Sequence, residues 1–127
     1  MKLELDTGSG SHTILSYTAT AIRLPQHTLE RSFILCPDRL IVDWTPQTLA
    51  ELSPAHLDPV VALDPEIVLL GTGARLYFPA ADILAPLRTR QIGFEVMDTA
   101  AACRCYNVLL SEGRRVVAAM FMIHLNP

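Results

Sequence analysis

The chain has 127 residues, of which 50% are hydrophobic and 18% are charged. This length fits a single domain over residues 1–127, and the apolar content excludes an intrinsically disordered chain, because it is sufficient to form a core. The net charge is −3, and the ten lysine and arginine residues are scattered rather than clustered. We therefore expect no nucleic-acid partner, since proteins that bind nucleic acids present a basic patch or stripe.

The N-terminal segment and the cysteines predict a cytoplasmic protein. Residues 1–6 alternate apolar and charged side chains, unlike the apolar centre of a secretory signal. The longest apolar run, residues 116–123, has eight residues, whereas a helix needs about 20 to cross a bilayer, so we expect no membrane insertion. Cys36, Cys103 and Cys105 have neither metal-binding nor disulfide spacing, and we expect them to be free thiols.

The first third of the chain predicts short β-strands. Ile14–Tyr17, Thr20–Leu24 and Ser32–Cys36 are rich in β-branched and apolar residues. The sequence Pro25-Gln26-His27 ends the second strand and separates the first two strands from the third. Pro37-Asp38 is expected to end the third strand, because proline has no N–H for a ladder hydrogen bond.

The middle of the chain contains several prolines. Ser53-Pro54 has the order of an N-cap followed by the first helical residue, which predicts a short helix to about Leu57 or a little beyond. Ile67–Leu70 is continuously apolar and predicts a strand buried on both faces. Ala80–Arg90 is moderately helical, and Pro86 inside it is expected to kink or split the helix.

The last third predicts a strand, a long helix and a strand. Ile92–Met97 is the first strand, and Asp98 stands where an N-cap belongs. Ala100–Glu112 contains good helix formers and is followed by Gly113, the residue typical of a helix C-terminus. Arg115–Ile123 is the final strand, apolar enough to be interior.

These elements predict the fold class. The alternation of strand and helix from Ile67 onward is typical of parallel strands joined by helices. Together with the β-rich N-terminal part, it predicts a single three-layer α/β domain with a mixed, largely parallel sheet.

The predicted helix Ala100–Glu112 is unusually apolar. Its polar residues Arg104, Asn107 and Ser111 are three and four positions apart and form one narrow stripe. The remaining surface must be covered on more than one side, either by other elements of the domain or by a partner. In the second case a protein partner, or a second copy of the chain, would contact Arg104, Tyr106, Asn107 and Arg114.

A ligand-binding cleft is the second candidate site. Gly71-Thr72-Gly73 follows a buried strand, where a phosphate-binding turn would lie, although the third glycine of that fingerprint is replaced by Leu76. The alternative is a structural turn that uses the conformational freedom of glycine.

Glu95 belongs to the same candidate cleft. It shares one face of its strand with Met97, so this carboxylate must pair with a cation or face an opening. The cations available to it are Arg75, Arg104, Arg114 and Arg115. The predicted ligand-binding set is Gly71, Thr72, Gly73, Arg75, Glu95, Asp98 and Thr99.

No arrangement of residues predicts catalysis, a metal or a cofactor. Cys103 and Cys105 point to different sides of the helix, and His12, His27, His56 and His124 have no ligand spacing. No serine stands in a Gly-x-Ser-x-Gly motif.

Four segments in order resemble a domain-of-unknown-function family that includes bacterial and archaeal hypothetical proteins and the mitochondrial NADH dehydrogenase (complex I) assembly factor three. They are Ser32–Pro37, Ile67–Gly73, Gly93–Leu109 and Glu112–Val116, and the resemblance covers about residues 32–123. It implies a three-layer α/β fold without established enzymatic activity. For the mitochondrial member it implies assembly of a respiratory complex through protein contacts. The chain departs from the family at Cys105, where threonine or a similar residue is usual, and we expect no transit peptide.

Two functional hypotheses remain open. The first is a non-enzymatic protein-interaction module that assists assembly of a respiratory or other membrane complex. The second is a small-molecule-binding or enzymatic domain with a cleft around Gly71–Gly73, Glu95 and Asp98. They differ in whether these groups converge on one concave pocket.

Overall fold

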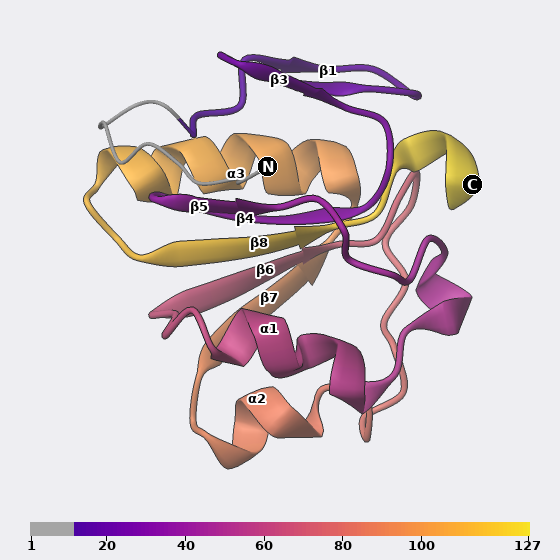
Figure 1. The fold of residues 1–127 in the computed structure, drawn as a ribbon. Helices are drawn as coiled ribbons and strands as arrows, with labels where there is room; N and C mark the ends of the chain where they lie inside the picture. Colours follow the sequence, from indigo (N-terminus) through magenta and orange to yellow (C-terminus); the bar gives the residue numbers. More distant parts are fainter. Residues whose placement is uncertain (1–11) are drawn as a thin grey trace.

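The computed structural model describes residues 12–127, and its elements stack in layers (Figure 1). The predicted features of residues 1–6 lie outside this range. A five-stranded sheet has the order β5-β4-β8-β6-β7. Its strands are β4 (Phe33–Cys36), β5 (Arg39–Ile41), β6 (Ile67–Gly71), β7 (Gly93–Met97) and β8 (Val116–Met120). Helix α3 (Thr99–Ser111) covers one face, and α1 (Asp58–Val61) and α2 (Ala85–Thr89) lie on the other.

The pairing of the strands confirms a mixed sheet. β6 is parallel to both of its neighbours, with Ile67 opposite Gly93 on β7 and Val116 on β8. β4 is antiparallel to β8 and to β5. β6 and β8 are therefore interior strands, as their apolar composition predicts, and all of β8 is buried.

A second, small sheet covers the outer side of α3 (Figure 1). It consists of β1 (Ser16–Tyr17), β2 (Ile22–Leu24) and β3 (His27–Leu29), all antiparallel. Ile22 and Leu29 from this sheet share one core cluster with Ala102 and Tyr106 from α3. The domain's own elements thus cover α3 on two sides, which accounts for the narrow polar stripe.

The opposite face of the large sheet forms a second core cluster. Trp44 and Phe121 are in tilted contact there, with ring centroids 5.2 Å apart. The Trp44 indole N–H donates a hydrogen bond to His56 O at 2.9 Å. This bond holds the short 3-10 helix η2 (Pro54–Leu57) beside the sheet, and a second 3-10 helix, η1 (Leu49–Glu51), precedes it.

Two strands that sequence reasoning missed follow the proline-containing breaks. Pro25 and Gln26 form a tight turn, because Leu24 on β2 pairs with His27 on β3. In the same way Cys36 on β4 pairs with Arg39 on β5 around Pro37-Asp38. Proline ends each preceding strand, but the chain reverses at once and forms a hairpin, which a proline signal alone does not reveal.

The ends of the C-terminal elements follow their local chemistry. Asp98 caps α3, since its Oδ1 accepts a hydrogen bond from Ala101 N at 2.9 Å. Gly113 follows the helix with a φ of +77°. The helix predicted over Ala80–Arg90 is shorter, α2 (Ala85–Thr89), so Pro86 neither kinks nor splits it. Pro86 lies in the first turn of α2, where its missing N–H costs nothing.

β8 also ends earlier than predicted. It stops at Met120, and the short helix η3 (Ile123–Leu125) follows. Within residues 12–127, no helix has the length and apolar composition needed to cross a membrane.

Candidate functional site

The glycine turn at the end of β6 is a structural junction rather than a phosphate-binding loop. Thr72 N donates to Met97 O at 2.9 Å, and Gly73 N donates to Thr99 Oγ1 at 2.8 Å. Ala74 N donates to Asn126 O at 2.8 Å. A phosphate site needs backbone N–H groups that point at the ligand, and these three are already used inside the chain.

The two threonines beside this turn are fully buried and bonded within the junction. Thr99 Oγ1 donates to Phe121 O at 2.7 Å, and Thr99 N donates to Gly73 O at 2.9 Å. Thr72 Oγ1 lies 2.5 Å from the carbonyl oxygen of Arg75. Gly71 allows a close approach here, because a Cβ atom on it would lie 2.8 Å from Met120 Sδ and 3.1 Å from Thr99 Cα. These residues hold the ends of β6, β7 and β8 together.

Glu95 does not have the ion pair expected from the sequence. Its side chain is exposed on β7, the outer strand of the sheet, and no ion pair or hydrogen bond links it to another residue in the range 12–127. An outer strand leaves the carboxylate in water, which removes the need for a buried partner.

The arginines considered for Glu95 lie elsewhere. Arg114 pairs with Glu66 at 3.2 Å, and Arg115 pairs with Asp38 at 3.2 Å. Arg104 Nη1 donates to the Tyr17 hydroxyl at 2.6 Å. Arg75 is exposed in the loop after the glycine turn.

Among the residues predicted to form an interaction surface on α3, Tyr106 was predicted wrongly, because its side chain is not at the surface. It is fully buried between α3 and the two sheets. Asn107 is bonded to the N-terminal segment, with Ile14 N donating to its Oδ1 at 2.9 Å and its Nδ2 donating to Ile14 O at 2.8 Å. Together with Arg104, these side chains attach the small sheet to α3. The sequence did not reveal this cover because the small sheet's strands are only two or three residues long.

The thiols are poorly suited to nucleophilic chemistry. Burial raises the pKa of the Cys103 thiol to about 12 and also raises the pKa values of Cys36 and Cys105. A thiol is nucleophilic as its thiolate, so these three side chains are protonated at neutral pH. In residues 12–127, no three histidine, cysteine or acidic side chains are grouped as metal ligands.

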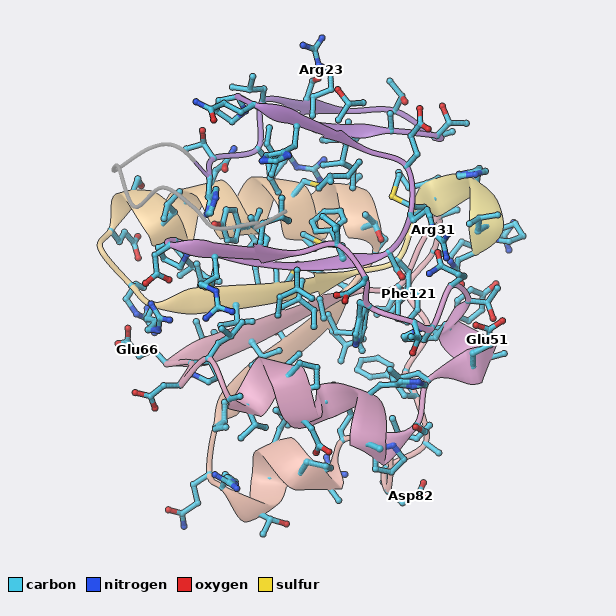
Figure 2. The ribbon with its side chains drawn as sticks, viewed as in Figure 1. Arg23, Arg31, Glu51, Glu66, Asp82 and Phe121 are labelled. Carbon is cyan, nitrogen blue, oxygen red and sulfur yellow. The ribbon has the colours of Figure 1, made fainter. Side chains whose placement is uncertain are left out.

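An apolar groove lies at the carboxyl end of the parallel strands. It has a volume of about 440 Å³ and lies between η1, the segment 77–83 and η3. Its apolar walls include Leu49, Tyr77, Pro79, Ile83 and Leu125. Figure 2 labels Glu51, the last residue of η1, and Asp82, which lies in the segment 77–83 but lines a separate pocket with Pro54 and Asp58. Of the predicted cleft residues, Thr72 lines this groove.

The groove adjoins a concentration of exposed apolar side chains. Seven large hydrophobic residues in the described chain are exposed, and four of them, Leu76, Tyr77, Phe78 and Leu125, belong to this region. Phe78 is the most exposed of all, at 73%. Sequence reasoning missed this surface, although the run Leu76-Tyr77-Phe78-Pro79 outside any predicted strand or helix was its visible signal.

The polar side chains of Thr72, Tyr77 and Asn126 beside the groove already have partners. The Asn126 side chain accepts from Leu49 N at 2.6 Å and donates to Met122 O at 3.1 Å. The Tyr77 hydroxyl donates to Pro127 O at 3.3 Å, and the Thr72 hydroxyl donates to Arg75 O at 2.5 Å. Small-molecule sites use a few such polar groups to orient the ligand. This groove instead presents apolar surface.

The layered arrangement, with a mixed sheet and a short N-terminal sheet over α3, defines an α/β domain that is similar to a solved domain described as Mth938-like. A solution structure of such a domain from Bordetella pertussis matches with a TM-score of 0.79 and 28% identity, over 96% of this chain and 92% of that one. The chain belongs to the family described as protein of unknown function (DUF498/DUF598), whose model matches residues 14–121. The match begins earlier than the resemblance seen in the sequence and includes the small sheet.

Two further proteins are similar to this chain. An NMR structure of a Xanthomonas campestris protein has 46% identity and a TM-score of 0.80, covering 91% of this chain and 87% of that chain. The zebrafish (Danio rerio) NADH dehydrogenase [ubiquinone] 1 alpha subcomplex assembly factor 3 is 32% identical over 114 residues, which are 88% of this chain. The match spans 65% of the zebrafish protein and between 44% and 55% of the other curated relatives.

Proposed function

We propose that this chain is a cytoplasmic, non-enzymatic protein-interaction module that assists assembly of a respiratory or other membrane complex. The observation that carries the proposal is the exposed apolar surface formed by Leu76, Tyr77, Phe78 and Leu125 around the apolar groove. Concentrated apolar exposure of this kind is typical of protein-interaction sites. The name of the zebrafish relative, an assembly factor, supports the same class of function.

The alternative, a small-molecule-binding or enzymatic cleft around Gly71–Gly73, Glu95 and Asp98, has less support. The amide groups at the turn are bonded within the chain, and the Asp98 carboxylate caps α3. Neither Glu95 nor Asp98 lines the apolar groove. A protein partner needs shape and apolar contact more than free polar groups, so the groove suits an anchoring side chain.

Affinity purification from native cells, followed by mass spectrometry, tests the proposal. Phe78→Ser should reduce recovery of the partner proteins by about tenfold or more, because a buried aromatic anchor commonly carries that much binding free energy. Val108→Ser is the matched control, since Val108 is also exposed, at 55%, but lies on α3. Equal recovery with wild type and Phe78→Ser would reject this surface as the partner site.

A further inference from the structure

The apolar surface has two complementary parts on one side of the molecule. Leu76, Tyr77 and Phe78 are exposed, and Phe78 retains most of its surface. The groove begins directly after them, because Pro79, Ala80 and Ile83 belong to its wall. A projecting apolar side chain therefore stands beside an apolar hollow.

This arrangement is self-complementary under a two-fold axis. When two copies face each other, Phe78 of each can enter the groove of the other, and the same patch serves both copies. Within one copy Phe78 does not line the groove and is 73% exposed, so insertion into a second molecule would bury surface that is open to water in the single copy.

The charges around the surface favour the same pairing. Arg75 directly precedes the projecting residues, whereas Glu51 is exposed and directly follows the groove residues Leu49 and Ala50. Arg75 forms no ion pair or side-chain hydrogen bond within residues 12–127, and Glu51 Oε1 accepts one hydrogen bond, from Gln47 N at 2.8 Å. Insertion of Phe78 into a second copy would bring the Arg75 cation toward the Glu51 carboxylate. Opposite charges at the rim of an interface assist encounter and fix its register.

We infer that the apolar surface binds a second copy of this chain, in a symmetric dimer in which each Phe78 occupies the other copy's groove. The inference rests on the proposed function, because the second copy would cover the interaction surface until a partner protein displaces that copy. The dimer would shield four large apolar side chains from water and from unspecific contacts.

The oligomeric state of the purified full chain, measured by analytical ultracentrifugation over a range of concentrations, tests the inference. The wild type should reach twice the chain mass of 14.0 kDa. Phe78→Ser removes the projecting side chain, and Ala80→Arg fills the groove at an exposed position. Each should raise the dissociation constant about hundredfold, because both copies lose a contact worth about tenfold. Val108→Ser should dimerise as the wild type does.

A mixture of the two variants provides the decisive measurement. The Ala80→Arg chain keeps its Phe78, and the Phe78→Ser chain keeps its groove, so one of the two contacts can form between them. The mixed dimer should be about tenfold weaker than the wild-type dimer and about tenfold stronger than either variant alone.

Three results would overturn the inference: a wild type that stays monomeric, a Phe78→Ser chain that dimerises normally, or a mixture no stronger than its components. A monomeric wild type whose partner recovery still depends on Phe78 would leave the proposed function intact. That outcome separates the failure of the dimer from the failure of the interaction surface.

Discussion

Asn126 occupies the space that a side chain on Gly73 would need. Gly73 has a φ of +107°, and a Cβ atom there would collide with the backbone carbonyl of Asn126. Ala74 N donates to that same carbonyl oxygen at 2.8 Å. Asn126 therefore cannot move aside without losing this hydrogen bond, and the contact fixes the C-terminal turn against the end of β6.

Replacing Gly73 with alanine should lower the free energy of unfolding by at least about 2 kcal/mol, through backbone strain and collision together. Gly113→Ala is the matched control, because Gly113 has a φ of +77° but nothing within 4 Å of its Cβ position. That change should cost about 1 kcal/mol, from backbone strain alone. Urea unfolding of both variants measures the difference, and equal losses would mean that Asn126 does not restrict Gly73.

Thr99→Val tests the junction at the start of α3. Valine has the same shape but no hydroxyl, so Gly73 N loses its acceptor and Phe121 O loses its donor. The loss should be about 1–3 kcal/mol, the cost of leaving buried polar groups unsatisfied. Thr28→Val, at an exposed position on β3, should change stability by less than about 0.5 kcal/mol. If the two variants unfold at the same urea concentration, the Thr99 hydroxyl does not stabilise the junction.

Tyr106→Phe should leave stability unchanged or raise it by about 1 kcal/mol. The Tyr106 hydroxyl is buried and has no hydrogen-bond partner within residues 12–127, and burial raises its pKa. Removing the oxygen keeps the ring in the core and relieves an unsatisfied group. Tyr106→Glu, in contrast, should unfold the protein, because it buries a charge without a partner. A clearly destabilised Tyr106→Phe chain, measured by thermal unfolding, would reveal a bond that the hydroxyl makes.

Glu66 should make stability depend on pH in the acidic range. The hydrogen bond from Arg115 N, at 2.9 Å, and the Arg114 guanidinium lower the pKa of Glu66 below its ordinary value of 4.5. A lowered pKa in the folded state means that the ionised carboxylate stabilises the fold at neutral pH. This contribution is lost as the pH falls below 4.5 toward the folded-state value.

The matched comparison uses Glu66→Gln and Glu95→Gln. Glu66→Gln should be less stable than the wild type at neutral pH, and the difference should shrink as the pH falls. Glu95→Gln should follow the wild type throughout, because Glu95 is exposed and unpaired within residues 12–127. The measurement is the thermal unfolding midpoint as a function of pH. A constant difference between Glu66→Gln and the wild type would contradict the role of the Glu66 charge.

The sequence by itself determined the elements whose signals are local. The apolar run at Ile67–Leu70 identified an interior strand, Asp98 and Gly113 marked the ends of α3, and the alternation after Ile67 predicted parallel pairing. Each depends on neighbouring residues, because capping, propensity and apolar periodicity act over a few positions.

Only the tertiary structure decided which groups meet. The Gly71–Gly73 turn looked the same in sequence whether its amides faced a ligand or Thr99 and Asn126, since those acceptors lie 26 or more residues away. The strand order likewise placed Glu95 on an outer strand, in water, and the small sheet placed Tyr106 in the core. The tertiary structure also left the apolar side chains around Phe78 exposed, because no distant element of the described chain packs over them. Whether an apolar residue is buried depends on elements that are distant in the chain. Because the hydrophobic effect is non-directional, no local sequence pattern identifies the element that buries a given residue.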